Sequence, residues 1–444
     1  MKKSIFWFRR DLRIDDNIGL FNCVKNSSEV ILLFIFDDDI LAKSPKNDQR
    51  LGFLIKLLEK LDTDLKKIGS YLLILKGNRD DIIKKIAEEN NVSSIYTNKA
   101  YSLSTIKSDN KIKAFFNDKS INFFEYEDSI LVPIDKVPVR KVFTPFYKLW
   151  QKELKEHVFE KITKINSPKI EMIPFEKIKT EISFSDSKYW DVNFIEKRLD
   201  MFDFEHYSET RNLPYIDGTS KISPYIRFGA VSIRKIYEKT KISPVFSSEI
   251  AWREFWYHIM HHFPETYNLE FQEKRRNIKW INNENHLEAW KEGKTGYPLI
   301  DAGMIQLKEE GWMHNRVRMV VASFLTKDLI IDWREGEKHF AKYLIDYDEN
   351  VNIGNWQWGA SVGADPKPLR IFSPFIQSEK FDPECVYIKK YIPELKNELP
   401  KNIHNPIKNV LKYHKPIVDH SEMIKITKLL YMDSKNFESN SDVF

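Results

Sequence analysis

The chain has few cysteines and no long apolar run. Its 444 residues include only two cysteines, Cys23 and Cys385. Cysteines so far apart exclude a disulfide framework and a cysteine-based zinc site. No apolar segment approaches the roughly 18 residues that a membrane-spanning helix needs. In the opening MKKSIFWFRRDLR the apolar stretch stops at Arg9 and Arg10, too early for a signal peptide. We therefore expect an intracellular, cytoplasmic protein that does not contact membranes.

A strong charge of one sign is also missing. Lysine and arginine number 70 and aspartate and glutamate 65, so the formal net charge is +5. This balance permits binding to nucleic acid only where basic residues gather on one face. Because 444 residues exceed what one hydrophobic core accommodates, we expect two or three domains.

Apolar runs alternate with helical patterns over the first 130 residues. The runs that predict buried strands are SIFWF, EVILLFIF, YLLILKG, SSIYTN and INFFEYE. Between them, DQRLGFLIKLLEKLDTDLKKIG repeats its apolar residues on one helical face. We expect residues 1–130 to form an α/β domain with a doubly wound, parallel five-stranded sheet. The first turn, FRRDLRIDDN, lacks the G-x-G-x-x-G fingerprint, so we expect any dinucleotide to bind elsewhere.

The pattern changes after residue 130. Residues 131–200 are weakly periodic and interrupted by prolines, which predicts a long connector. Helical patterns follow one another through residues 201–420 and strand signals almost vanish, so we expect a large all-α domain there. Residues 421–444 are polar and predict a frayed helix or tail.

One helical segment combines charges with aromatic rings. In SSEIAWREFW, the residues Glu249, Trp252, Arg253 and Trp256 lie at i, i+3, i+4 and i+7, on one helix face. A carboxylate and a cation beside planar rings suit a nucleobase. The structural alternative is the edge of a core with one salt bridge.

A second segment, GWMHNRVRM, places Asn315, Arg318 and Met319 on one face. An amide, a guanidinium and a thioether together suit a ligand with polar and apolar parts. An ordinary amphipathic helix is equally compatible with this pattern. The sequence therefore leaves both interpretations open.

Hydroxyl groups gather before a third helical segment, DGTSKISPY. Ser223 followed by Pro224 predicts a helix start, with serine as the cap and proline at the first helical position. Thr219 and Ser220 add hydroxyls ahead of it, and helix N-termini with free donors bind phosphate. The purely structural alternative is a capped turn.

Two weaker signals point to other classes of site. Residues 359–363, GASVG, match the G-x-S-x-G nucleophile elbow, but the prolines that follow deny the helix that this motif requires. His258, His261 and His262 have no carboxylate or cysteine at ligand spacing. We expect neither a serine hydrolase nor a metal site.

Tryptophan is concentrated in one part of the chain. Eight of the eleven tryptophans lie between Trp252 and Trp358. Two of them, Trp356 and Trp358, stand in NVNIGNWQWGASVG, a segment rich in glycine and asparagine that predicts a polar, flexible loop. Large aromatics in such a loop call for a role besides core packing.

Ordered blocks from residue 7 to the 380s resemble the DNA photolyase and cryptochrome family. The blocks are WFRRDLRIDDN, FTPFYKLW, GTSKIS, IAWREFW, KTGYPLIDAGM, GWMHNRVRM, IDWREGEKHF, NWQW and EKFDPE. The resemblance covers about residues 1–420 and is strongest to class I cyclobutane pyrimidine dimer photolyases. It implies an N-terminal α/β antenna domain and a C-terminal helical domain that binds FAD.

The resemblance also implies roles for matching residues. Arg318 and Asp346 match a charge pair beside the isoalloxazine, and Asn352 matches the residue that faces flavin N5. The implied FAD-binding set is Tyr207, Thr219, Ser220, Lys221, Ile222, Ser223, Arg318, Asp346, Asp348 and Asn352. The implied substrate-binding set is Glu249, Trp252, Asn315, Met319 and Trp358. An electron path to the flavin is implied through Trp280, Trp333 and Trp356.

The implied reaction is light-driven repair of cyclobutane pyrimidine dimers in DNA. A flipped-out dimer receives an electron from excited reduced FAD and returns it after the ring has split. We expect a monomer without metal that associates with the nucleoid through DNA. Expected phosphate contacts come from Arg211, Arg253 and Arg316, with Lys274, Arg275 and Lys380 as further candidates.

The resemblance leaves alternatives open. A cryptochrome-type blue-light receptor would act through partners, and plant members carry Asp at the position of Asn352 together with a long tail. Photolyases for the (6-4) photoproduct place histidine in the pocket where this chain has Trp252 and Met319. Thr105 stands where folate-binding members have glutamate, so a second, antenna chromophore would be a deazaflavin or a second flavin rather than a folate, or there is none.

Overall fold

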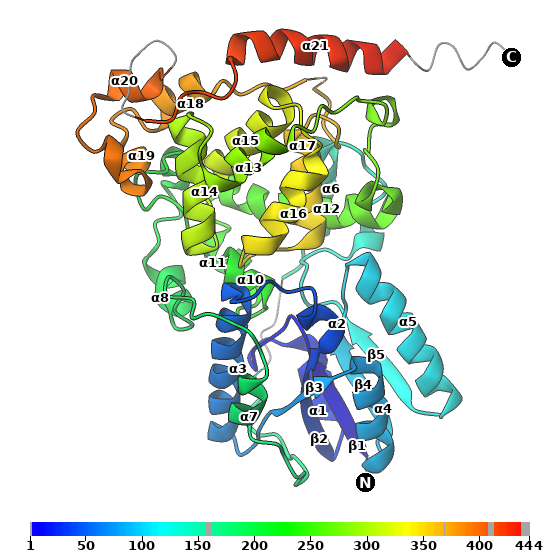
Figure 1. Ribbon diagram of the computed structural model, residues 1–444. Coiled ribbons are helices and arrows are strands. Elements are labelled where there is room, and N and C mark those ends of the chain that lie inside the picture. Colours follow the sequence, from blue (N-terminus) through cyan, green and yellow to red (C-terminus); the bar gives the residue numbers. More distant parts are fainter. Residues whose placement is uncertain (1, 157–160, 368, 407–412, 437–444) are drawn as a thin grey trace, which may run out of the picture. The chain divides into compact units, whose positions relative to one another are not determined.

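The computed structural model describes residues 2–156, 161–367, 369–406 and 413–436 (Figure 1). The chain divides into two compact units. The first comprises residues 1–137, 151–202 and 221–241, and the second comprises residues 138–150, 203–220 and 242–444. This division differs from the predicted ranges, because residues 151–202 and 221–241 return to the first unit.

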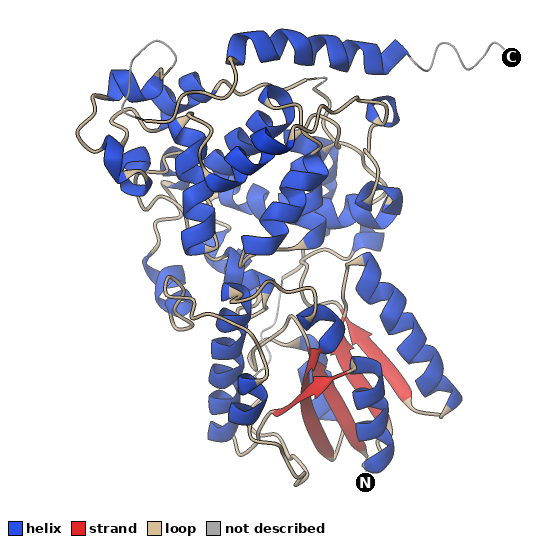
Figure 2. Cartoon of the chain, viewed as in Figure 1, coloured by secondary structure: helices blue, strands red, loops and turns tan. Residues whose placement is uncertain are grey.

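The first unit contains a five-stranded parallel sheet, shown in red in Figure 2. Its strand order is β3-β2-β1-β4-β5. The strands are β1 (Lys3–Phe8), β2 (Glu29–Asp37), β3 (Leu73–Gly77), β4 (Ser94–Asn98) and β5 (Asn122–Tyr126). Parallel strands that are buried on both faces are apolar almost throughout, as β1 and β2 are here. The predicted sheet, with five parallel strands, is confirmed.

Helices cover both faces of this sheet. The apolar residues of α4 (Arg79–Glu89) and α5 (Leu103–Asp118) pack with Ile5 and Trp7 of β1. On the other face lies α1 (Ile18–Asn26), where a Cβ added at Gly19 would come within 3.0 Å of the Phe6 ring. The helix α3 (Gln49–Lys67) buries most of its predicted apolar stripe and begins at Asp48, whose side chain accepts the Arg50 amide.

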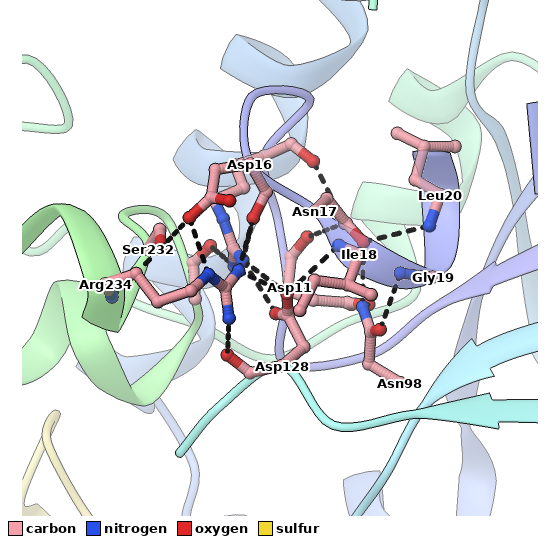
Figure 3. A network of polar contacts seen from close by, with 12 residues as sticks. Asp11, Asp16, Asn17, Ile18, Gly19, Leu20, Asn98, Asp128, Ser232 and Arg234 are labelled. Atoms are coloured by element: carbon pink, nitrogen blue, oxygen red, sulfur yellow. Dashed lines mark hydrogen bonds and ion pairs between the residues drawn. The ribbon is translucent and has the colours of Figure 1, made fainter. Parts of the chain in front are cut away.

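Buried charges tie a late segment of the chain into the first unit. Arg13 and Arg234 both donate to the carboxylate of Asp128, at 2.7 and 2.8 Å. Arg234 also pairs with Asp16 at 2.8 Å. Figure 3 shows this network. Because Arg234 belongs to α11 (Ile233–Thr240), these contacts hold residues 221–241 against the loop after β1.

At the carboxyl ends of β1 and β4, side-chain amides and a carboxylate hydrogen-bond to one another. Asn98 donates to Asp11 at 2.6 Å and to Asn17 at 2.8 Å (Figure 3). Burial raises the pKa of Asp11 to about 6. The order of the strands reverses between these two ends, where open α/β sheets usually bind ligands. Here the protein's own side chains occupy that position, in agreement with the missing glycine fingerprint.

The predicted connector contains regular structure. Within residues 131–200 lie α6 (Phe143–Glu153), α7 (Phe175–Thr180) and α8 (Phe194–Met201, which ends one residue later). Prolines lie at positions 168 and 174, ahead of α7, and interrupt the segment without preventing these short helices. The predicted connector therefore includes three helices within or at the edge of its range.

The regular elements of the second unit, within its described residues, are all helices. Its longer helices are α12 (Pro244–His262), α13 (Glu284–Glu292), α14 (Pro298–Glu310), α15 (Asn315–Ser323), α16 (Trp333–Tyr343), α17 (Glu349–Gly359), α18 (Pro374–Phe381) and α21 (His420–Asn436). Shorter helices are α9 (Tyr207–Thr210), α19 (Val386–Tyr391) and α20 (Pro400–His404). The predicted all-α character is confirmed. One large apolar cluster from α13 to α17 forms its centre.

The predicted polar loop around NWQW was wrong, because residues 349–359 form the helix α17. Its glycine and asparagine residues have low helix propensity. The side chain of Asp348 caps the helix by accepting the Val351 amide. A Cβ at Gly354 would lie 2.4 Å from the Trp256 ring, so glycine is required for this close packing. Tertiary contacts and capping override the propensity.

The sequence left a frayed helix or a tail open for residues 421–444, and residues 421–436 belong to the helix α21. Thr427, Tyr431 and Ser434 are buried on one face of this helix. The Thr427 hydroxyl donates to the Lys327 carbonyl, and the Tyr431 hydroxyl donates to the Ala360 carbonyl, both at 2.5 Å. A polar sequence is therefore held by specific hydrogen bonds. The rest of the predicted tail, residues 437–444, lies outside the described residues.

Candidate active site

An ion pair between Arg211 and Glu249 joins residues that we predicted for different tasks. Glu249 lies on α12, and its carboxylate is 2.8 Å from the Arg211 guanidinium. Burial raises the pKa of Glu249, and Arg211 acts in the opposite direction. Arg211 also lies over the Tyr207 ring, 5.3 Å from its centroid. A predicted DNA contact, a predicted substrate contact and a predicted FAD contact therefore lie together.

The aromatic residues of α12 divide into two groups. Trp252 is half-buried and stacks on Phe143, with ring centroids 3.7 Å apart and planes 7° apart. Trp256 is buried against Gly354 and belongs to the core. The structural alternative from the sequence thus holds for Trp256. Trp252 is therefore the more accessible of the two rings.

The N-terminal turn of α15 presents Asn315 and Met319 together. The Asn315 amide nitrogen lies 3.9 Å from the Met319 sulfur. Asn315 is exposed and Met319 is half-buried. The same helix directs Arg318 to Asp346, with a distance of 2.8 Å. The two charges that the resemblance places beside a flavin do form an ion pair.

A hydrogen-bonded chain leads from α12 to the cap of α17. Arg253 donates to the Tyr257 hydroxyl at 2.9 Å, and Tyr257 donates to Asp348 at 2.7 Å. Further along α17, the Asn352 amide donates to Glu337 at 3.0 Å. Asn352 is thus held in one orientation by its own partner.

Trp356 and Trp358 lie in different surroundings because residues two apart on a helix point to different sides. Trp356 is buried and has Phe340 and Trp290 as aromatic neighbours, with centroid distances of 4.9 and 6.2 Å. Trp358 is half-buried, and the Arg370 guanidinium lies 4.8 Å from its ring centroid. The difference in surroundings agrees with the separate roles that we predicted, although the segment is a helix and not a loop.

The three tryptophans of the predicted electron path belong to one apolar cluster. Trp333 and Trp356 are buried members of it, and Trp280 is half-buried and packs against it. The indole N–H of Trp333 donates to Glu270 at 3.2 Å. Trp280 is thus the most accessible of the three, and the electron path through them stays a prediction.

The predicted phosphate-binding run needs one correction. Ser223 is the first residue of α10 (Ser223–Arg227), and Ile222 occupies the cap position without a side-chain hydrogen bond. Lys221 has a φ of 54°, in the left-handed region. Thr219 and Ser220 belong to the second unit, whereas Lys221, Ile222 and Ser223 belong to the first. The run thus spans the boundary between the two units.

The predicted DNA-contacting cations are not equivalent. Arg316 donates to Asn212 at 2.7 Å and lies over Phe381, and burial lowers the pKa of Arg316. Arg275 was wrongly considered, because it is buried and donates to Ser434 at 3.0 Å. Lys380 is exposed and Lys274 is half-buried. Arg275 therefore holds α21 in place and is not available to phosphate.

The two weak signals lead to structural roles. Ser361 is fully buried, follows a helix rather than a strand, and accepts the Arg370 amide at 2.9 Å. His258 accepts the Arg140 amide at 3.0 Å, and burial lowers the pKa of His258 to about 4. In the described parts of the chain, no three histidine, cysteine, aspartate or glutamate side chains are grouped so that they could hold a metal ion.

Sequence reasoning missed three polar partners: Tyr257, Glu270 and Glu337. Each hydrogen-bonds a predicted site residue, namely Asp348, Trp333 and Asn352. Tyr257 lies one helical turn after Arg253, and this spacing could have shown it. Glu270 and Glu337 lie 63 and 15 residues from their partners, so no local pattern indicates them.

Known proteins match along nearly the whole chain. A family model described as "DNA photolyase" matches residues 4–168, and one described as "FAD binding domain of DNA photolyase" matches residues 246–432. The deoxyribodipyrimidine photo-lyase of Synechococcus sp. is 35% identical, with 97% of this chain and 96% of that protein covered. The chain belongs to the DNA photolyase family. The corresponding protein of Escherichia coli is 34% identical, with coverage of 95% and 97%.

Solved structures agree with this membership. An archaeal photolyase from Sulfolobus tokodaii, described as containing two FAD molecules, has a TM-score of 0.91 at 36% identity, with 97% of this chain and all of that chain covered. A cryptochrome from Synechocystis has a TM-score of 0.87 at 26% identity, with 97% and 99% covered. The predicted family and FAD as cofactor are confirmed.

The residues present fit a flavin in the photolyase family. Within the second unit, Arg318, Asn352 and the hydroxyls of Thr219 and Ser220 are donors of the kind that the carbonyl and phosphate oxygens of FAD require. The Arg318–Asp346 pair is partly accessible, with side chains 25% and 5% exposed.

None of the helices within the described residues has the length and apolar character of a membrane span.

Proposed function

We propose that this photolyase-family member repairs cyclobutane pyrimidine dimers in DNA under blue light. The observations that carry the proposal are three pairs of the second unit, namely Glu249 with Arg211, Trp252 on Phe143, and Asn315 with Met319. They offer a carboxylate acceptor, flat ring surface and a soft apolar contact. A pair of fused pyrimidines needs an acceptor for its N–H groups and apolar surface for its ring faces.

The residues of the chain would bind and orient, and the cofactor would supply the redox chemistry. When bound, reduced FAD supplies one electron to the dimer under light and takes it back after the ring has split. Glu249 would accept hydrogen bonds from the pyrimidine N–H groups. Trp252, Met319 and Trp358 would exclude water from the two rings. Asn352, held by Glu337, would present its amide to the flavin.

Contacts to the DNA backbone would come from the cations beside these pairs. Arg211 already pairs with Glu249, so a phosphate that engages Arg211 would release the carboxylate for the dimer. Arg253 and Arg316 are half-buried and each has a neutral partner, Tyr257 and Asn212 respectively. Both guanidinium groups are cations that would attract phosphate.

We make a separate proposal about the chemical class of an antenna chromophore. Thr105, which stands at the predicted antenna position, exchanges a hydrogen bond with Ser102 at 2.8 Å. A hydroxyl has neither the negative charge nor the second oxygen with which a carboxylate accepts two parallel donors, so we propose that any antenna chromophore is not a folate. Extraction of all chromophores from the purified protein, followed by absorption spectroscopy, would identify a second flavin or a deazaflavin. Recovery of a folate would refute this.

Repair is tested by irradiating the chemically reduced protein with an oligonucleotide that contains one thymine dimer. We expect intact thymines to be restored under blue light and not in the dark. The content of reduced FAD is measured in the same sample. If the flavin is bound and reduced and no thymines are recovered, the proposal fails, and a receptor of the cryptochrome type or a (6-4) photolyase becomes the better interpretation. The same experiment with a (6-4) photoproduct separates those two.

A further inference from the structure

Trp333 is unusual among the buried tryptophans of the path because a carboxylate accepts its indole N–H. Glu270 Oε1 lies 3.2 Å from Trp333 Nε1, and Glu270 is only 3% exposed. Trp356, the preceding member of the path, is bordered by the rings of Phe340 and Trp290. The two indoles are therefore buried in one apolar cluster but in different electrostatic surroundings.

Arg334 completes the charged surroundings of Trp333. Its guanidinium lies 4.7 Å from the Trp333 ring centroid and donates to the same Glu270 oxygen at 2.9 Å. It also pairs with Asp332 at 3.0 Å. Two carboxylates thus face one guanidinium, and the group has a net formal charge of −1. Asp332 is partly exposed, whereas Glu270 is buried, so the effect of Glu270 on the indole is the less screened.

We propose that Glu270 stabilises the oxidised form of Trp333 and thereby draws the electron vacancy away from the flavin. The inference rests on the proposed electron path. Trp356 gives one electron to light-excited, oxidised FAD and receives one from Trp333, which becomes a radical cation. The indole N–H proton of that cation is shared with, or moves to, Glu270 Oε1. An external thiol finally restores the electron by way of Trp280.

Electrostatics favours this direction of transfer. A negative charge beside a buried ring stabilises a positive charge on the ring far more than it would in water. Oxidation also makes the indole N–H a stronger acid, so its hydrogen bond to a carboxylate tightens. No such group appears among the described ring neighbours of Trp356. The vacancy should therefore reside on Trp333 and not return at once to Trp356. Glu270 is a positioning residue for electron transfer and does not touch FAD or DNA in this proposal.

The test is Glu270→Gln, which keeps the shape and one acceptor oxygen but removes the charge. We expect photoreduction of oxidised flavin with an external thiol to slow by about tenfold or more, as the loss of one nearby unit charge implies. Transient absorption should show a shorter-lived tryptophan radical, with a smaller solvent-deuterium isotope effect. The matched control is Glu273→Gln, an exposed carboxylate three residues away, which should behave as the parent. Parent-like kinetics and spectra for Glu270→Gln would overturn the proposal.

A second variant separates electrostatics from loss of structure. Arg334→Gln removes the cation over the ring but leaves Glu270, so photoreduction should be as fast as in the parent or faster. If both variants slow photoreduction alike, Glu270 acts only through packing and the proposal is wrong. Melting temperature and bound FAD are measured for each variant. In the dark, the Trp333 indole proton should exchange faster with solvent in Glu270→Gln than in the parent.

Failure here and failure of the proposed repair activity can be told apart. Repair by chemically reduced protein does not use the tryptophan path, so Glu270→Gln should repair dimers at the parent rate. Loss of repair in the parent itself would refute the proposed function. Unchanged photoreduction in Trp333→Phe would refute the path on which the inference rests, and with it the inference.

Discussion

Two ion pairs of this protein have the same chemistry and the same length but opposite surroundings. Arg234 and Asp128 in the first unit are 2.8 Å apart, with side chains 3% and 2% exposed. Arg211 and Glu249 in the second unit are also 2.8 Å apart, but are 20% and 33% exposed. Distance alone therefore does not show what an ion pair does. Burial and the number of further partners do.

The first pair is closed to ligands, and the second is open to them. Asp128 receives Arg13 as well, and Arg234 also binds Asp16, so the charges are satisfied inside the protein. Such a network is costly to break, because a charge would remain buried without compensation. A half-exposed pair contributes little to stability, about 0–1 kcal/mol. Its charges can turn to DNA instead, as we propose for Glu249 and Arg211.

A similar contrast between a buried and a half-buried side chain exists within α17. It leads to the largest effect that we expect, which is on light-driven reduction of the flavin. Trp356 is buried beside Phe340, whereas Trp358 is half-buried beside Arg370. Trp356→Phe and Trp333→Phe keep most of the apolar volume but remove the easily oxidised indole, so light-driven reduction of oxidised flavin by a thiol should fall nearly to background. Both variants should repair dimers once the flavin is reduced chemically. Trp358→Phe is the matched control and should photoreduce normally. Photoreduction of Trp333→Phe at the parent rate would show that these rings only fill space.

Breaking the closed pair should give the largest change in stability. Asp128→Asn leaves Arg13 and Arg234 without their shared carboxylate, and we expect the free energy of unfolding to fall by about 3–5 kcal/mol. Asp64→Asn, at a surface pair with Lys60, should cost no more than about 1 kcal/mol. Urea titrations of both variants measure this. Equal costs would mean that burial does not distinguish the pairs.

The pH dependence of the same pair has a definite sign. Burial alone would raise the pKa of Asp128, but the guanidinium groups of Arg13 and Arg234 lower it below its ordinary value. The carboxylate therefore stabilises the fold fully above the unfolded-state pKa of about 3.9, and this contribution is lost as the pH falls through the lower folded-state value. The stability difference between parent and Asp128→Asn should thus shrink in acid below about pH 4.

Removing the carboxylate of the Arg211–Glu249 pair should slow repair and hardly change the free energy of unfolding. Glu249→Ala removes a charged acceptor worth about 1.5–3 kcal/mol, so repair should slow by roughly ten- to a hundredfold. FAD should remain bound, because the carboxylate contacts substrate and not cofactor in our proposal. Glu238→Ala is the control and should repair normally; Glu238 lies on α11 and pairs with Lys241 just after that helix. Loss of flavin in Glu249→Ala would instead place this residue in the cofactor site.

The smallest expected effect concerns the DNA backbone. Each phosphate contact contributes a slope of about 0.9 to log K against log salt for duplex DNA. Arg316→Ala should lower the slope by roughly one unit, although the side chain is already bonded to Asn212. Lys66→Ala, an exposed cation of the first unit, should leave the slope unchanged. A parent-like slope for Arg316→Ala would show that this residue does not meet phosphate.

The sheet was predictable from sequence and two helices were not. Parallel strands such as β2 are buried on both faces, so every residue from Val30 to Phe36 is apolar and the run is visible at once. The helix α17 was mistaken for a loop because Asn350, Asn352, Gly354 and Asn355 disfavour helix locally, and only the Asp348 cap and the contact of Gly354 with Trp256 compensate. The helix α21 could not be told from a tail, because hydrogen bonds from Thr427 and Tyr431, rather than an apolar stripe, hold it.

The site shows a similar division between local and distant information. Residues on one helix turn, such as Asn315 and Met319, could be grouped by spacing alone. The pairing of Arg211 with Glu249 could not, since 38 residues separate them along the chain. The same holds for Glu270 and Trp333, whose contact depends on how a loop passes the start of α16. Sequence thus indicated which groups matter, and the fold shows which of them share a partner.

The contrast between the two ion pairs is tested most directly by measuring unfolding and repair on the same preparations of Asp128→Asn and Glu249→Ala. Repair of a thymine-dimer oligonucleotide is measured per molecule of folded, FAD-reduced protein, and unfolding by urea titration. We predict a crossed result: Asp128→Asn loses stability and repairs at the parent rate, whereas Glu249→Ala keeps its stability and repairs slowly. If Glu249→Ala instead loses stability while its folded molecules repair normally, the open pair is structural, and the proposed site is contradicted.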